Sequence, residues 1–306
     1  QTLTPRGGRL LQERLRHPWR ELGPIQAGLE MVTFFHGQDD LRATLRQGLD
    51  LVYDVERLST RICLGRAGPK DFVALRQSLG SLPALREALA DPGIENPPAR
   101  LTELLAGWDD LDDVADLLQR ALVDSPPPVI TEGGLFRQGY NPELDECIDL
   151  TEHGEGRLKD LLDREREATG LAKLKLGYNR VFGYYFELPK SLVDQAPYHF
   201  IRRQTLANGE RFTSPELKEL EERLVAASER RKSLEYTLFQ GLRETVDQAR
   251  SRLLFMAGVL AGLDFWQGLA EAARTRDWIR PVVTCGLDLR ILGGRHPVVE
   301  AVQGAA

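Results

Sequence analysis

A long run of leucines at helical spacing constrains this chain more than any other feature. Residues 213–216 are a helix start signal: either Ser214 caps the helix with Pro215 at the first helical position, or Thr213 and Glu216 form a capping box. Apolar residues then alternate at intervals of three and four for more than three heptads, at Leu217, Leu220, Leu224, Ala227, Leu234, Leu238 and Leu242, with Arg231 as the one interruption. This predicts a helix from 215 to about 253, close to 60 Å long.

A second long helix is predicted upstream. Asn141-Pro142 reads as a cap followed by proline at the first helical position, and Gly170 reads as a stop. We therefore expect one helix over 142–169, of about 28 residues, weakened in its middle by Gly154 and Gly156.

Between the two long helices the periodicity changes to that of strands. Lys173–Tyr178 and Val181–Leu188 alternate or contain β-favouring aromatic residues, with Asn179-Arg180 as a turn between them. We expect strand structure to continue over 198–205. The sequence thus predicts a small antiparallel β unit inserted between two long helices.

The remaining sequence favours helices. From Arg9 to about Leu122, leucines recur at spacings of three and four, separated by turn signals such as Gly23-Pro24. The run Leu253–Leu263 is too short to span a bilayer and is interpreted as a buried core helix. The predicted class is mainly α, with the divisions 1–139 (helical core), 140–169 (ascending helix), 170–213 (β insert), 214–252 (descending helix) and 253–306 (return to the core).

A proline run at 126–128 and Gly133-Gly134 close the first division. We interpret 126–134 as a hinge between the helical body and the long helices. Because the chain begins with Gln1 rather than Met, we expect it to be a piece of a larger protein.

The charge of the chain is unevenly distributed. Its 306 residues sum to −6, which argues against a uniformly basic nucleic-acid-binding module. Residues 173–211, however, contain seven basic and three acidic side chains, a net charge of +4, while the rest of the chain sums to −10. Guanidinium, ammonium, amide and hydroxyl groups suit phosphate contacts, so the β insert is the candidate nucleic-acid surface. A solvated surface with internal ion pairs is the alternative.

Aromatic residues also gather in the insert, at Tyr178, Phe182, Tyr184, Tyr185 and Phe186. They could stack on nucleobases. Packing of the small sheet's own core is the favoured interpretation.

No catalytic or metal-binding constellation is predicted. The five histidines are scattered, and the three cysteines form no CxxC pair, which is typical of a protein from a reducing cytoplasm. The acidic pairs Asp109-Asp110 and Asp112-Asp113 are interpreted as a solvated helix face.

Several stretches resemble the MutS family of DNA mismatch-repair proteins. They are GYNRVFGYYFEL (177–188), YHFIRRQTLANGERFTSPELKELEERL (198–224), TPRGGRLLQERLRHPWREL (4–22), VERLSTRICLGRAGPKDF (55–72) and GGRHPVVE (293–300). They extend over essentially the whole chain in the family's order.

The resemblance implies the family's central core, two lever helices and a clamp that grips duplex DNA through its phosphate backbone. It places a mismatch-reading domain before Gln1 and an ATPase domain, with ATP and Mg²⁺, after Ala306. The sequence contains no GxxxxGK[ST] phosphate loop, so no enzyme activity, cofactor or metal is expected in this chain. The implied partners are double-stranded DNA, a second copy of the complete protein and a MutL-type protein, in the cytoplasm and without a membrane.

The resemblance also implies a DNA-contact set in the clamp. It comprises Lys190, Arg202, Arg203, Gln204, Thr205, Asn208 and Arg211. Where the family commonly has lysine, this chain has Ala207, which removes one phosphate contact, and Gly209 would let the backbone approach DNA. The alternative function is a helical scaffold for oligomerisation or partner docking without DNA binding of its own.

Overall fold

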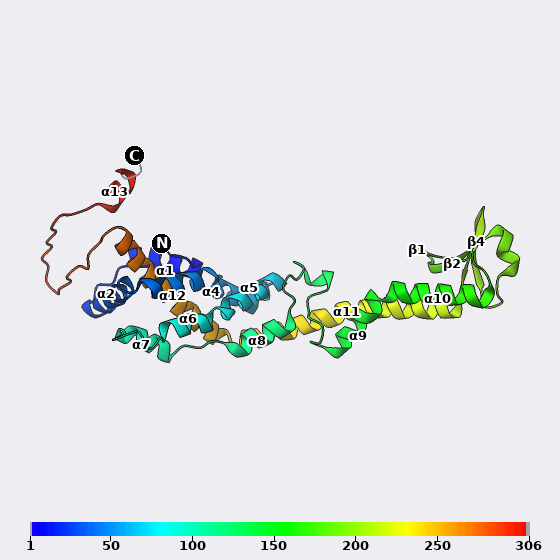
Figure 1. Cartoon of the computed structure of the whole chain (residues 1–306), viewed down its shortest axis with the longest axis horizontal. Helices are drawn as coiled ribbons and strands as arrows, with labels where there is room; N and C mark the ends of the chain where they lie inside the picture. The colour runs from blue at the N-terminus through cyan, green and yellow to red at the C-terminus, as the bar shows by residue number, and fades with distance from the viewer. Residues whose placement is uncertain (1, 304–306) are drawn as a thin grey trace. The chain divides into compact units, whose positions relative to one another are not determined.

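The computed structural model describes residues 2–303 and is mainly helical, with one four-stranded antiparallel sheet (Figure 1). The predicted fold class is confirmed. Its contacts form two compact units, and each is discontinuous in sequence. Unit 1 consists of Gln1–Asp50, Ala84–Trp108 and Gly258–Ala306, and unit 2 of Leu51–Pro83 and Asp109–Ala257.

Unit 1 is built around the apolar helix α12 (Arg250–Thr275), which begins in unit 2. The other helices of this unit are α1 (Pro5–Arg16), α2 (Leu22–His36), α3 (Asp39–Asp50), α6 (Leu82–Leu89), α7 (Ala99–Ala106) and α13 (Pro297–Gln303). The carboxylate of Asp264, buried in α12, accepts hydrogen bonds from the backbone N–H of Leu3 (3.0 Å) and from the N–H (2.8 Å) and hydroxyl (2.7 Å) of Thr4. These bonds fix the start of α1 to the core helix.

Helix α12 contains the apolar run that was predicted to be a core helix. In the described part of the chain it is the one helix long and apolar enough to cross a membrane, but 78% of its most apolar window is buried. Leu253, Leu260 and Leu263 are almost completely buried. The core-helix prediction is confirmed.

Unit 2 contains the long helices and the sheet. Its elements before the sheet are α4 (Val55–Cys63), α5 (Pro69–Gly80), α8 (Asp112–Ala121), η1 (Ile130–Glu132), α9 (Pro142–Glu152) and α10 (Gly154–Thr169). After the sheet, α11 (Pro215–Gln248) returns beside α10 and α9 (Figure 1, green and yellow). Ser214 caps α11 as predicted, because its hydroxyl accepts a hydrogen bond from Leu217 N–H (3.1 Å).

The predicted single helix over 142–169 is wrong. Helix α9 ends at Glu152, and a new helix begins at Gly154. Gly154 packs so closely against α11 that a Cβ there would lie 2.7 Å from Leu224 Cδ2. Glycine thus lets Leu224 pack closely here, at a position where glycine also weakens a continuous helix.

The descending helix is also shorter than predicted. It ends at Gln248, which gives a length of about 51 Å for its 34 residues. Toward this end the buried positions are Glu235, Phe239, Leu242 and Val246 rather than the predicted Leu234 and Leu238, which are half-buried.

The sheet consists of β1 (Lys175–Asn179), β2 (Gly183–Pro189), β3 (Ile201–Thr205) and β4 (Gly209–Thr213), in the order β1-β2-β4-β3. The turn at Asn179-Arg180 and the strand over 201–205 are confirmed, whereas β4 was not predicted as a separate strand. A short 3₁₀ helix, η2 (Lys190–Gln195), follows β2.

One face of the sheet packs on the two long helices. Phe186, Leu188 and Phe212 of the sheet are buried in one cluster with Leu158, Leu161 and Leu162 of α10 and Leu217 of α11. Polar contacts add to this packing. Tyr184 N–H donates to Glu221 Oε1 of α11 (3.1 Å), and His199 Nε2 lies 3.1 Å from Glu165 Oε2 of α10. The opposite face of the sheet is left free of the helices.

Of the two acidic pairs, Asp112 and Asp113 lie on an exposed helix face as predicted, whereas Asp109 and Asp110 precede the helix and are half-buried and buried. Arg252 of α12 binds Asp109 (2.6 Å) and Asp113 (2.8 Å), and Asp110 is buried. The hydrogen bond from Arg252 lowers the pKa of both Asp109 and Asp113 below the ordinary value, and outweighs the opposing effect of burial.

The pKa shift predicts a pH-dependent contribution to stability. A carboxyl whose folded pKa is depressed stabilises the fold above its unfolded pKa, and this contribution is lost as pH falls through the folded pKa. Asp109→Asn should therefore lower the free energy of unfolding at pH 7, because it removes the ion pair with Arg252. The loss should be only about 1 kcal/mol, since surrounding water screens the pair. Urea denaturation should show the difference shrinking below pH 4. Asp116→Asn, an exposed position of α8 without an ion pair in residues 2–303, is the control, and an equal effect there would contradict the assignment.

Gly183 provides a local test of how the sheet is held. Its φ is +75°, and a Cβ there would lie 1.8 Å from Glu221 Oε1, the acceptor of the Tyr184 N–H. Gly183→Ala should cost about 1–3 kcal/mol, seen as faster hydrogen exchange in β1 and β2. Gly241→Ala, in the exposed interior of α11 with nothing within 4 Å, should stabilise that helix by about 1 kcal/mol. Unchanged exchange in the Gly183 variant would refute the attachment.

Candidate nucleic-acid interface

The candidate surface is formed by the edge strand β3, its turn into β4 and the start of η2. Leu206 N–H donates to Gly209 O (2.8 Å) across the turn, and Lys190 N–H donates to Asn208 O (3.1 Å). These bonds bring Lys190 beside Asn208. Gly209 is buried, and a Cβ there would lie 2.4 Å from Leu188 O. Its glycine therefore serves packing between strands, and the expectation that DNA approaches this backbone is wrong.

Two of the predicted arginines form ion pairs with acidic residues of neighbouring strands. Arg202 Nε lies 2.6 Å from Glu210 Oε2. Arg211 Nε lies 3.3 Å from Glu187 Oε2, its Nη1 donates to Gln204 Oε1 (2.9 Å), and its guanidinium lies 4.2 Å from the Tyr185 ring centroid. The Arg211 side chain is only 20% exposed. Arg211 and Gln204 thus stabilise one another across β3 and β4.

The other predicted residues are exposed. Arg203 lies where the β3–β4 register shifts between Arg202 and Gln204, so a bulge leaves Arg203 without a cross-strand partner. Thr205 and Asn208 are exposed at the adjoining turn, and Lys190 is exposed at the start of η2. Within residues 2–303, neither Arg203 nor Lys190 forms an ion pair. Their charges are available to a ligand.

Lys175 is a further exposed cation that the predicted contact set omits. The register places Lys175 of β1 opposite Glu187 of β2, and Glu187 opposite Arg211 of β4. Lys175 therefore shares the free face of the sheet with Arg211, since side chains directly opposite one another point to the same face. The strand alternation in Lys173–Tyr178 contained this information, because it places Lys175 opposite in direction to the buried Leu174 and half-buried Leu176.

The aromatic residues of the insert divide into buried and exposed side chains. Phe186 is fully buried and stacks on Phe200 with ring centroids 5.1 Å apart, and Tyr185 is 9% exposed. The core-packing interpretation is confirmed for Phe186 and for Tyr184, which packs against the same cluster, whereas Tyr185 lies on the other face beneath the Arg211 guanidinium. Tyr178 (60%) and Phe182 (47%) are exposed near the β1–β2 turn.

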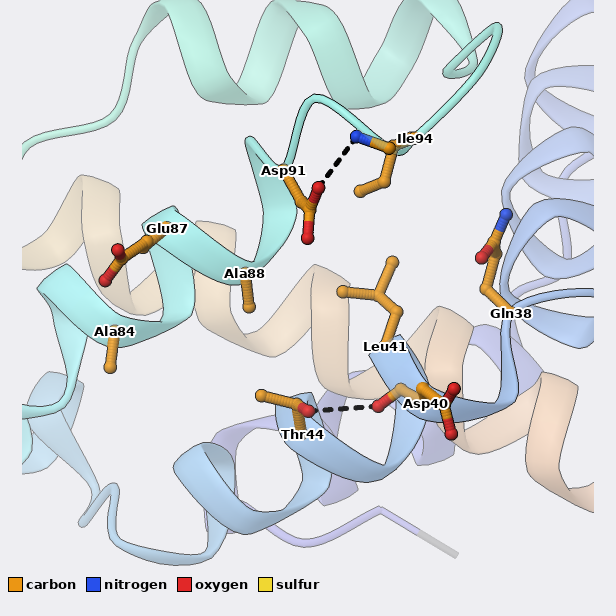
Figure 2. A pocket seen from close by; sticks show the side chains of 10 residues that line it. Gln38, Asp40, Leu41, Thr44, Ala84, Glu87, Ala88, Asp91 and Ile94 are labelled. Carbon is orange, nitrogen blue, oxygen red and sulfur yellow. Dashed lines mark hydrogen bonds between the residues drawn. The ribbon is translucent and has the colours of Figure 1, made fainter.

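Unit 1 contains a cavity of different character. It has a volume of about 510 Å³ and lies between α3 and α6, where Leu41, Ala88 and Ile94 provide its apolar lining (Figure 2). Its charged lining residues are Asp40, Glu87 and Asp91, without lysine or arginine. Carboxylates repel phosphate, so this cavity does not suit the DNA backbone. Among residues 2–303, no group of three or more His, Cys, Asp or Glu residues is arranged to hold a metal ion.

The comparisons with known proteins agree with this architecture. A family model described as MutS domain III matches residues 1–270. The chain is 59% identical to the DNA mismatch repair protein MutS of Nitratidesulfovibrio vulgaris (strain DP4), in an alignment that covers 100% of the chain and 35% of the relative. It is 47% identical to the MutS protein of Lawsonia intracellularis, over 99% of the chain and 35% of the relative.

More distant relatives have the same name. The MutS protein of Acetivibrio thermocellus is 38% identical, over 99% of the chain and 34% of that relative. The chain thus spans about a third of the length of these relatives. Since the family model extends over most of the sequence, the chain belongs to the MutS family.

Proposed function

We propose that this chain acts in DNA mismatch repair as the part that grips duplex DNA through its phosphate backbone. In this proposal residues 170–213 are the clamp, 140–169 and 214–252 are the levers, and 1–139 with 253–306 form the core. One observation carries the proposal: exposed cations without ion pairs in the described chain, Arg203, Lys190 and Lys175, lie on an insert whose net charge is +4.

The chemistry of this surface favours phosphate over base contacts. Arg203 and Lys190 supply positive charge, while Thr205 and Asn208 supply a hydroxyl and an amide that hydrogen-bond to phosphate oxygens. Such contacts contain no sequence information. The clamp therefore binds matched and mismatched duplexes alike, and discrimination is left to the mismatch-reading domain that the family resemblance places before Gln1.

Arg202 and Arg211 have a different role in the proposal. The Arg202–Glu210 pair and the Arg211–Gln204 hydrogen bond hold the β3–β4 hairpin in shape, and the Arg211–Glu187 pair ties it to β2, so that Arg203 and Asn208 are presented together. The substitution of lysine by Ala207 reduces the number of cations at the turn. With two or three phosphate contacts, log K falls with log salt concentration at a slope of roughly −2 to −3.

The levers connect DNA binding to a catalytic domain outside this chain. No GxxxxGK[ST] sequence occurs here, so we assign no ATP or Mg²⁺ contact to these residues and propose that the chain is not itself an enzyme. ATP hydrolysis, pairing of two copies and recruitment of a MutL-type partner belong, in this proposal, to the complete cytoplasmic protein. Because α10 and α11 pack on one another and on the sheet, a rotation at their core end displaces the clamp.

A scaffold that docks partners without DNA is the second candidate. The segment after α12 favours it, because Val282 (92%), Leu287 (103%) and Leu289 (87%) are exposed. Fluorescence titration with a short duplex at low salt separates the two functions. Binding at or below tens of micromolar supports the clamp, and failure to bind at that concentration favours the scaffold for the chain by itself.

The contact set predicts a sequence-independent loss of affinity. Arg203→Ala combined with Asn208→Ala should weaken binding equally for matched and mismatched duplexes, because both residues contact the backbone. The salt slope should become less negative by about 1, since one cationic contact is removed. Fluorescence anisotropy over a range of salt concentrations measures both effects. Selective loss of mismatch binding would contradict the assignment.

The ion-paired Arg211 and the unpaired Arg203 should differ in effect: loss of Arg211 should mainly lower the stability of the sheet, and loss of Arg203 should mainly lower DNA affinity. Arg211→Ala removes no proposed phosphate contact. It should destabilise the sheet by about 1–2 kcal/mol through loss of the Tyr185 contact and the Glu187 pair. Arg203→Ala should change stability by less than about 0.5 kcal/mol. Hydrogen exchange of the sheet amides measures this, and similar effects of the two substitutions would refute the distinction.

A further inference from the structure

The lever α11 contains a buried carboxylate at its middle. Glu235 is 1% exposed. Its Oε1 accepts a hydrogen bond from Gly134 N–H (2.9 Å), and its Oε2 accepts one from Leu135 N–H (3.2 Å). Arg231, one turn earlier, lies 3.2 Å from the same carboxylate. A buried charge with three donors is compensated, and removal of that charge leaves those donors without an ionised acceptor.

The two N–H donors come from a backbone arrangement that suits an anion. Gly133 and Gly134 have φ values of +74° and +77°, a conformation that favours glycine. The N–H groups of the next two residues, Gly134 and Leu135, both point at the Glu235 carboxylate. The segment 126–134, which the sequence suggested as a free hinge, is therefore attached to α11 at its glycine end.

Arg231 extends the attachment to the other lever. Its Nη1 donates to Thr151 Oγ1 (3.2 Å) and it lies 3.8 Å from Glu152 Oε1, at the last residues of α9. The helix is interrupted immediately afterwards, at His153, before α10 begins. Three segments thus meet at one pair of side chains: the 122–137 connection, the ascending lever and the descending lever.

We infer that the Glu235–Arg231 pair is the fulcrum of the levers, and that Glu235 is a positioning residue through which core movement reaches the clamp. Its attachment holds the core end of α11 to the connection. The interruption at His153 directly follows the α9 residues that Arg231 contacts, so the angle between α9 and α10 can change there, while α11 runs unbroken from Pro215 to Gln248 and moves with the sheet as one rod. This inference rests on the proposed coupling of the clamp to an ATPase domain.

Glu235→Gln is the most selective change at this point. Glutamine keeps the shape of the side chain and one oxygen acceptor, but its amide N–H₂ faces a donor and the charge that holds Arg231 is lost. The matched control is Glu244→Gln, because Glu244 is exposed on the same helix. Neither position lies in the clamp, so neither substitution removes a proposed DNA contact.

The test uses the complete protein with spin-label amino acids at Ala207 in the clamp and Asp116 in α8. Double electron–electron resonance gives the distance between them with and without ATP. We expect a nucleotide-linked distance shift in the wild type and in Glu244→Gln, and loss of most of that shift with a broader distribution in Glu235→Gln. Nucleotide-free duplex affinity should be unchanged in all three, which a general loss of structure would not allow.

Two outcomes distinguish this inference from the proposed function. If Glu235→Gln has a lower melting temperature but an unaltered nucleotide-linked shift, the residue is merely structural and the inference fails. If the wild type binds duplex but shows no shift, the proposed coupling fails first. Should Glu235→Gln not fold, Arg231→Gln removes the ion pair with Glu235 and the bridge to α9 but keeps the Glu235 hydrogen bonds to Gly134 and Leu135. A full wild-type shift in that variant overturns the fulcrum.

Discussion

Packing of one sheet face against α10 and α11 is the interaction on which the rest of the clamp depends. Phe186, Leu188 and Phe212 bury against leucines of both helices, so a sheet of four short strands does not need a second layer of its own. The same packing determines which side chains face outward, because successive residues of a strand point to opposite faces. Lys175 and Arg211 are directed away from the helices for this reason. Phe186 and Phe212 face the helices, so they stabilise the attachment of the sheet and are not available to stack on bases.

Internal ion pairing then decides which charges remain for the DNA contacts that we propose. The net charge of −6 for the whole chain conceals an insert at +4, and within that insert Glu187 and Glu210 already neutralise Arg211 and Arg202. The bulge at Arg203 leaves that residue without a partner residue on β4. The candidate surface is therefore narrower than a count of basic residues indicates, and it is held in shape by arginines that do not themselves contact phosphate in the proposed arrangement.

The sequence predicted the long helices, the inserted sheet and the buried α12, because each follows from the period of apolar residues. It did not predict the interruption at His153, since that depends on how closely Gly154 approaches Leu224 of another helix. Glu235 was missed for a related reason: periodicity treats a carboxylate as a surface residue, whereas Gly134 and Leu135, about 100 residues away, provide the N–H groups that let it be buried. The Asp109–Arg252 contact likewise joins residues too far apart in sequence for a local pattern to reveal. The DNA-contact set stays a prediction.

Site-specific crosslinking tests the central claim most directly. A benzophenone amino acid at Ala207, in the exposed β3–β4 turn, should crosslink to matched and mismatched duplexes in equal yield, and the yield should fall as salt rises. The same group at Tyr236, which is exposed on α11 outside the clamp, should give little product. Crosslinking from Tyr236 but not Ala207, or from Ala207 to mismatched duplex alone, would contradict a clamp that grips the DNA backbone.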